Sequence, residues 1–165
     1  MKRKTIFCSV LALLFAVSMA AGAFAQTVDF QYSLGGSSRY GLIDEDGTSQ
    51  YSNPLLFSLT GSRLFISDIS TMSAPVEIGT LALPGIARRI AQSGDILYIS
   101  CSYGGLAAVT VADPAKPAII SVTNFDKSDA IGQTFGVAAK GNYVYIADYS
   151  GLFVLDVTTP SSPNI

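Results

Sequence analysis

The side chains that could carry out chemistry in this 165-residue sequence are carboxylates, arginines and tyrosines, because the chain contains no histidine. Histidine is the usual general base and the commonest metal ligand at neutral pH. Its absence excludes Ser-His-Asp, Cys-His and zinc-type sites within this chain. A catalytic function would therefore need carboxylates that converge on a bound cation.

Asp44-Glu45-Asp46-Gly47-Thr48 is the one cluster in the sequence that resembles a cation site. Oxygen ligands followed by a turn-forming glycine suit calcium. The spacing lacks a third properly placed ligand and a distal bidentate glutamate, so this segment is not an EF-hand loop. We expect a solvated hairpin tip, with Asp44 and Asp46 as weak calcium candidates and no other cofactor.

Five residues are candidates for ligand binding because they fall in segments expected to share one end of the fold. They are Arg39, Arg88, Tyr103, Asp148 and Tyr149. The segments expected to form the innermost strands are 39–44, 87–92 and 134–139. The two arginines lie near the start of the first two of these strands, and the other three residues lie in expected turns. The alternative for Asp148 is a local side-chain-to-backbone hydrogen bond that caps its own turn. The tyrosines would then pack beside the turns.

Three further residues have reactive side chains for which a structural role is expected. Cys101 could be a reactive thiol, but no histidine or nearby cation would activate it, and a half-buried small residue is expected instead. Asp68 and Asp156 recur at the same repeat position inside strands. We expect them to hold neighbouring turns through buried hydrogen bonds rather than to do chemistry.

The first 25 residues have the pattern of a secretory signal peptide. Lys2, Arg3 and Lys4 precede an apolar run, and Ala23-Phe24-Ala25 forms a small-x-small cleavage site. The alternative is an uncleaved membrane anchor, but a run of about 15 apolar residues is short for a ~30 Å hydrocarbon core. We expect an exported protein that is periplasmic, on the cell surface or secreted, with no membrane insertion after cleavage.

Charge and cysteine content restrict the partners of the mature chain. Removal of residues 1–25 leaves seven basic against twelve acidic residues, a formal net charge of −5, with no basic cluster. This balance argues against nucleic acid or an anionic membrane as a partner. Only Cys101 survives cleavage, so no intrachain disulfide can form. Stability must come from packing.

The sequence after the signal peptide is built from a repeat. Residues 54–75 align without a gap to residues 142–163, with seven of the 22 positions identical, and residues 95–117 form a middle copy with one residue inserted near Gly104. The prolines that end the copies, Pro75, Pro117 and Pro163, are 42 and 46 residues apart. This period fits a blade of four short strands.

The strands within each copy are apolar on both faces, which is typical of sheets that are covered on both sides. We therefore predict an all-β, propeller-like array of about three four-stranded antiparallel blades, with units at residues 28–75, 76–117 and 118–163. A two-sheet sandwich is the alternative fold. A closed propeller usually has four to eight blades, so we expect an open or partial propeller.

The motif from Tyr143 to Asp148, followed by Gly151 to Val157 and then by Pro160 and Pro163, closely resembles the LVIVD repeat. The resemblance weakens in the first copy, where Thr60 replaces the acidic residue of the motif. The LVIVD family is associated with β-propellers in exported bacterial and archaeal proteins. The resemblance implies the fold and the location, and it implies no activity.

Three functions are consistent with these features. The first is a non-catalytic, exported propeller module that binds a protein or carbohydrate ligand. The second is a fragment of a propeller hydrolase or lyase that uses channel carboxylates and a cation, and the third is a structural spacer of a cell-surface protein. The repeat positions expected at the channel hold Thr60, Cys101 and Asp148, only one of which is acidic, and this favours binding. Further propeller blades or another copy of the chain are the other expected partners.

Overall fold

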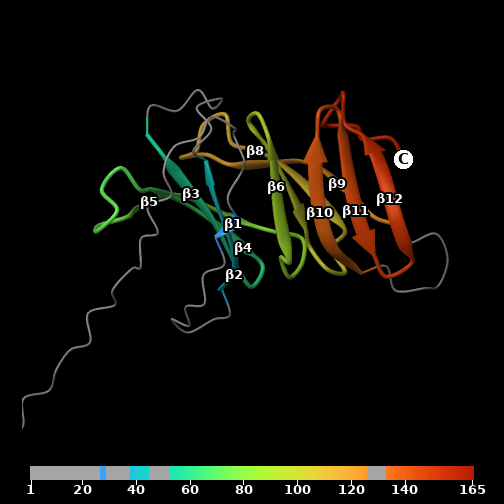
Figure 1. Ribbon diagram of the computed structural model, residues 1–165, viewed down its shortest axis with the longest axis horizontal. Coiled ribbons are helices and arrows are strands. Elements are labelled where there is room, and N and C mark those ends of the chain that lie inside the picture. The colour runs from blue at the N-terminus through green and yellow to red at the C-terminus, as the bar shows by residue number, and fades with distance from the viewer. Residues whose placement is uncertain (1–26, 29–37, 45–52, 126–132) are drawn as a thin grey trace, which may run out of the picture.

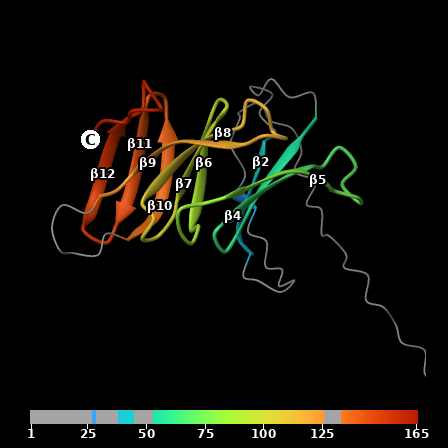
Figure 2. The same ribbon diagram turned by 180° about the vertical axis from the view of Figure 1, so that it is seen from behind.

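The computed structural model describes residues 27–28, 38–44, 53–125 and 133–165, and every regular element among them is a strand. The strands form three antiparallel sheets that stack in chain order (Figure 1), and Figure 2 shows the same order from behind. The predicted all-β array of propeller-like blades is confirmed, and the two-sheet sandwich is wrong. Residues 1–25, the predicted signal peptide, lie outside the described residues.

The strands of each sheet are consecutive in the chain. The first sheet consists of β1 (Thr27–Val28), β2 (Ser38–Asp44), β3 (Leu55–Thr60), β4 (Arg63–Asp68) and β5 (Val76–Ala82). The second consists of β6 (Arg89–Ser93), β7 (Ile96–Ser100), β8 (Leu106–Thr110) and β9 (Ala118–Thr123). The third consists of β10 (Thr134–Lys140), β11 (Tyr143–Asp148) and β12 (Gly151–Asp156).

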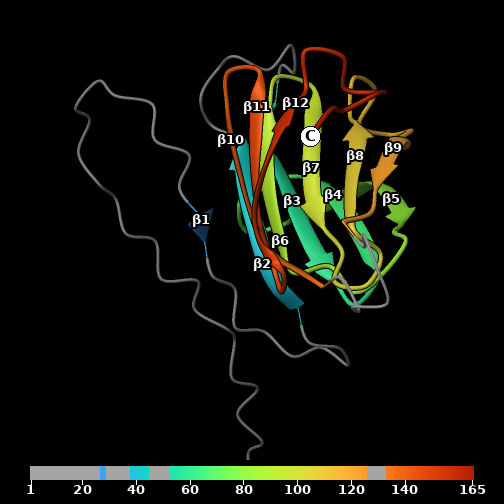
Figure 3. The same ribbon diagram turned by 90° about the vertical axis from the view of Figure 1, so that its right-hand side faces the viewer.

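The inner strands of the three sheets lie near one another. Strands β2, β6 and β10 gather on one side of the molecule, opposite the outer strands β5 and β9 (Figure 3). The segments predicted as inner strands, 39–44, 87–92 and 134–139, overlap these three strands, so this prediction is confirmed. Sheets arranged in this way correspond to blades around a propeller axis.

The sheets divide the chain at a different point of the repeat from the units ending at the prolines. Strand β5 pairs with β4, and β9 pairs with β8, so the strand after each proline completes the sheet before it. A repeat can be divided at any point of its period, and both divisions describe the same repeat. The division by sheets separates the units that pack against one another through the two buried clusters.

The three sheets have the same turn after β4, β8 and β12. A side-chain oxygen of Asp68, Thr110 or Asp156 accepts a hydrogen bond from the backbone N–H two residues later, at 2.8, 3.4 and 2.8 Å. The predicted turn-holding role of the two aspartates is therefore confirmed. Their hydrogen bonds are exposed rather than buried, because these turns lie outside the packed faces of the sheets.

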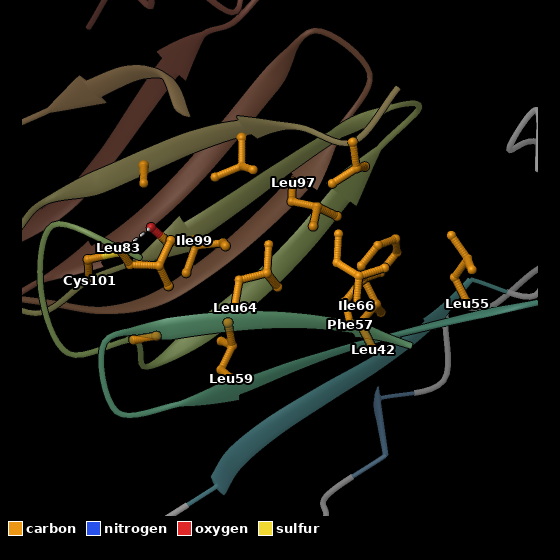
Figure 4. Close-up of a cluster of buried hydrophobic side chains, with 14 residues drawn as sticks. Leu42, Leu55, Phe57, Leu59, Leu64, Ile66, Leu83, Leu97, Ile99 and Cys101 are labelled. Atoms are coloured by element: carbon orange, nitrogen blue, oxygen red, sulfur yellow. Dashed lines mark hydrogen bonds between the residues drawn. The ribbon is translucent and has the colours of Figure 1, made fainter. Parts of the chain in front are cut away.

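The first and second sheets pack through apolar faces, which alternation along the strands predicts. We call the face that a sheet turns toward the next sheet in the chain its forward face, and the opposite one its backward face. The forward face of the first sheet contributes Leu55, Phe57, Leu59, Leu64 and Ile66. They lie against the backward face of the second sheet, where Leu97, Ile99 and Cys101 are buried (Figure 4).

The second and third sheets repeat this packing. Tyr98, Leu106 and Ala108 on the forward face of the second sheet form one cluster with residues on the backward face of the third sheet, namely Val144, Ile146, Leu155 and Val157. The expectation that both faces of a sheet are covered holds for the second sheet. In the third sheet it is wrong for the forward face, where Tyr143, Leu152 and Val154 are exposed.

The outer strands make a second contact between successive sheets. A Cβ atom built on Gly79 of β5 would lie 2.0 Å from the carbonyl oxygen of Pro114, so the two backbones approach too closely for a side chain. At the matching place of the next interface, the Ser121 hydroxyl donates a hydrogen bond of 2.7 Å to the carbonyl oxygen of Pro160. The proline-containing turns therefore hold the outer margin of each interface.

Truncating a side chain at the first interface should destabilise the whole chain. Phe57 is fully buried between two sheets, and Phe57→Ala is expected to lower the free energy of unfolding by about 3–5 kcal/mol, because it leaves a cavity. Met72→Ala, at an exposed turn residue, is the control and should change it by less than ~0.5 kcal/mol. Urea denaturation measures both, and equal effects would contradict the packing described.

The turn aspartates should make stability depend on acid. Hydrogen bonds from the backbone and side chain of Ser70, and from Asn53, hold the pKa of Asp68 below its usual value. Hydrogen bonds from the side chain and backbone of Thr158 do the same for the pKa of Asp156. A lowered pKa in the folded state stabilises the fold above the unfolded-state pKa of about 3.9, and this contribution is lost as pH falls through the folded-state pKa.

The thermal midpoint, measured from pH 6 to pH 2, tests this dependence. The wild type should be more stable than Asp68→Asn/Asp156→Asn near pH 6, and the difference should shrink as the pH falls below about 4. Glu77→Gln, which removes an exposed carboxylate on β5, should not change the pH profile. A difference that stays constant down to pH 2 would disprove the assigned role.

Candidate functional site

The five predicted ligand-binding residues lie at one end of the stacked sheets, which we call the loop end. Ser38 pairs with Thr60, Arg89 with Ser100, and Thr134 with Asp148, so the starts of the inner strands lie beside the β3–β4, β7–β8 and β11–β12 turns. The predicted residues are distributed over these starts and turns: Arg39 in β2, Arg88 before β6, Tyr103 after β7, and Asp148 and Tyr149 at the end of β11. The side chain of Arg39 lies outside the described part of the structure.

The turn that carries Tyr103 has an unusual backbone. Ser102 has φ 52° although it is not a glycine, and Gly105 has φ 74°. A positive φ is uncommon outside glycine and persists where the surroundings fix it. Here Gly104 lies directly against Pro84 and Gly85, where an added Cβ would be 2.7 Å from a backbone atom. The tight approach fixes the turn, so Tyr103 projects from a rigid support.

Gln133 and Thr134 connect the Tyr103 turn to the Tyr149 turn. The carbonyl oxygen of Ser102 accepts hydrogen bonds from the backbone N–H and the hydroxyl of Thr134, at 3.1 and 3.2 Å. The Gln133 side-chain amide donates to the Ser102 hydroxyl at 2.9 Å. The Gln133 carbonyl accepts the backbone N–H of Tyr149 at 3.0 Å. The second and third sheets thus share one hydrogen-bonded segment at the loop end.

The tyrosines of these two turns are the most exposed aromatic side chains among the described residues. Tyr103 is 64% exposed and Tyr149 is 79% exposed. The expectation that they pack beside the turns is therefore wrong. Both turns are tight and are fixed by hydrogen bonds to Gln133 and Thr134, so the residue at each tip projects away from the sheets.

Arg88 lies between the second and third sheets at the loop end. Its backbone N–H donates to the carbonyl oxygen of Ser100 at 2.8 Å, and its guanidinium carbon lies 6.0 Å from the ring centroid of Phe135, which is within cation–π range. Its Nε atom is buried and makes no hydrogen bond within the described part of the chain. Buried polar atoms nearly always have a partner, so this donor is a candidate contact for a ligand.

Asp148 is buried at the end of β11 and caps its own turn. Its Oδ1 accepts hydrogen bonds from the backbone N–H and the hydroxyl of Ser150, at 3.0 and 2.7 Å, and this confirms the capping alternative. Its Oδ2 is buried and has no hydrogen-bond partner among the described residues. The matching residue of the second sheet, Cys101, is also buried. The carboxylate therefore lies within the stack rather than on its surface.

Cys101 is completely buried in the first interface, which is deeper than predicted. Desolvation raises the pKa of its thiol to about 12, against opposing hydrogen bonds from the backbone of Ala107 and Gly85. A thiol needs to ionise before it can act as a nucleophile or a metal ligand. Cys101 is thus a packing residue.

The acidic cluster at 44–48 is described only at its first residue. Asp44 is 7% exposed, so the expected solvated tip is wrong for this residue. Asp44 is the last residue of β2, and it pairs with Leu55, which belongs to the core. Its side chain therefore lies on the same face of the sheet as Leu55. Asp46 lies outside the described residues, and the calcium expectation stays a prediction.

The described residues contain neither a metal-binding cluster nor a membrane-spanning helix. No group of three or more acidic or cysteine side chains there could hold a metal ion. No helix in that part of the chain is long and apolar enough to cross a membrane.

Sequence reasoning missed the residues that join the turns. Ser102, Gln133, Thr134 and Phe135 are ordinary polar or apolar residues with no motif around them. The inserted residue near Gly104 was the one available signal, because it shows that this turn differs from the other two. The contacts themselves join positions about 30 residues apart, and local patterns do not report them.

Comparison with known families agrees with the sheet boundaries. The family model described as LVIVD repeat matches residues 84–124 and 131–165. The first stretch contains β6 to β9 and the second contains β10 to β12, so each match covers one sheet. The predicted first copy lies outside the matched residues. No curated protein matches the chain. The chain thus contains two stretches, residues 84–124 and 131–165, that match the LVIVD repeat.

Proposed function

We propose that this protein is a non-catalytic, exported propeller-like module that binds a protein or carbohydrate ligand at its loop end. The observation that carries the proposal is the pair of exposed tyrosines, Tyr103 and Tyr149, on turns joined by Gln133 and Thr134. Exposed rings leave apolar surface in contact with water, which is unfavourable. A partner that covers the rings would remove this unfavourable contact.

Tyrosine suits this role for physical reasons. Its ring offers a large apolar surface with only two rotatable side-chain bonds, and its hydroxyl can form a hydrogen bond at the same contact. A rigid turn beneath the ring reduces the entropy lost on binding. Both a sugar face and an apolar protein side chain fit such a surface.

Two charged side chains near the tyrosine turns would add polar specificity. Arg88 Nε and Asp148 Oδ2 are buried atoms of opposite charge without hydrogen-bond partners among the described residues. A ligand group that reached them after a small movement of the turns would satisfy both. Export is part of the proposal because of the residue pattern at 1–25.

Binding can be tested with two defined probes, an array of oligosaccharides and a displayed peptide library, each challenged with the labelled exported protein. At least one probe should be retained, and Tyr103→Ser/Tyr149→Ser should weaken its binding about tenfold or more, because the rings supply most of the contact area. Met72→Ser, at an exposed residue far along the chain from both turns, should bind as the wild type does. Probes retained equally by the double variant would contradict the proposal.

The hydrolase or lyase alternative predicts a calcium-type cation at the channel. If the protein is a binding module, calcium chloride should leave its thermal midpoint within about 1 °C of the value in a chelator. A rise in the midpoint that is lost in Asp148→Ala would favour the cation-using alternative. Glu77→Ala, at an exposed glutamate of β5, is the control for the loss of an acidic side chain.

A further inference from the structure

The forward face of the third sheet is exposed although the same repeat positions are buried in the other two sheets. Phe57, Tyr98 and Tyr145 are matched in the repeat, and they are 0%, 1% and 38% exposed. A second matched set behaves in the same way. Leu64, Leu106 and Leu152 are 0%, 1% and 71% exposed. The residue types at these positions suit burial in all three sheets, and among the described residues no sheet follows the third.

The nine residues of this face form three rows across three strands. In the middle row Ala138 pairs with Tyr145, which pairs with Val154. The row nearest the loop end holds Gly136, Ala147 and Leu152, and the remaining row holds Lys140, Tyr143 and Asp156. The face is apolar apart from the last row, where a cation on β10 and an anion on β12 lie at opposite margins.

The backward face of the first sheet is less apolar than the matching faces of the second and third sheets. Where the second and third sheets have Ile99 and Ile146, the first sheet has Ser58. Where they have Val109 and Leu155, it has Ser67. Head-to-tail packing of one chain on the next would bury these two hydroxyl groups against apolar side chains, although it would also cover Leu56 and Phe65, their strand partners.

We infer that the forward face of the third sheet is a dimer interface at which a second copy of the chain packs face to face about a two-fold axis parallel to the strands. Such an axis sets β10 of one chain opposite β12 of its partner and keeps the rows aligned. Lys140 then faces Asp156 of the partner subunit, and Asp156 faces the partner's Lys140. The interface continues the packing mode of the two interfaces within the chain.

Side-chain size is complementary under the same axis. The bulky Leu152 and Val154 of β12 come opposite the partner's Gly136 and the partner's Ala138, the small residues of β10. Tyr143 and Tyr145, on the central strand, meet their own copies across the axis. Large residues facing small ones let two sheets approach to about 10 Å, the usual distance between packed sheets.

Sedimentation velocity over a range of concentrations measures the dimer directly. The wild-type exported protein should form a dimer and no larger species, because a two-fold interface closes on itself. Tyr145→Lys sets like charges against each other at the axis and should raise the dissociation constant about 100-fold or more. Tyr145 is exposed in the single chain, so the variant should keep its β-type circular dichroism. Met72→Lys, at an exposed residue of the turn between β4 and β5, should dimerise like the wild type.

A charge-swap experiment tests the orientation, with circular dichroism to check that Asp156→Lys, which also loses the hydrogen bond from Thr158, keeps its fold. Lys140→Asp and Asp156→Lys should each weaken self-association about tenfold, because each places like charges across the interface. Mixing the two variants should restore dimerisation to near the wild-type strength, since both cross-interface pairs are again of opposite charge. A monomer at all concentrations, association that continues beyond the dimer, a Tyr145→Lys dimer of unchanged strength, or a mixture no stronger than its components would each overturn the inference.

Discussion

The structure depends on one constraint: a strand that is apolar on both sides must lie in a sheet that is covered on both faces. The second sheet meets this constraint through its two neighbours, with Leu97 and Ile99 on one face and Tyr98 and Leu106 on the other. Neither neighbour could be removed without exposing half of that core. With no disulfide and no metal group among the described residues, sheet-to-sheet packing is the main source of stability.

The same packing places the candidate site. Stacking sets the starts of the inner strands side by side, and this brings the Ser102 turn within hydrogen-bonding distance of Thr134. The loop end is therefore not an independent set of loops, because its hydrogen bonds run between sheets. A change in sheet spacing would break the bonds between Gln133 and the two tyrosine turns, and the shape of the site would change with it.

Much of the fold follows from the sequence, because a proline ends each copy of the repeat. The alternation of apolar strands and the prolines at 75, 117 and 163 were enough to predict the number of sheets and their inner strands. The burial of Asp44 and Asp148 was not predictable, since it is set by core residues of neighbouring strands and sheets rather than by the local polar sequence. The exposure of Leu152 was not predictable either, because its repeat position matches those of Leu64 and Leu106, which are buried. The difference is that the described residues contain no sheet packed on the forward face of the third sheet.

The two ends of the stack differ in a way that has consequences for assembly. A repeat array stays soluble when its terminal faces are polar. The backward face of the first sheet follows this rule only in part, because Ser58 pairs with Phe65 and Ser67 pairs with Leu56. The forward face of the third sheet breaks it with two tyrosines, a leucine and a valine. Head-to-tail growth into open chains would bury the hydroxyl groups of Ser58 and Ser67 against apolar side chains, and this makes it the less favourable contact. The apolar end is instead self-complementary in charge and in size, and a surface of that kind is satisfied by a single closed contact.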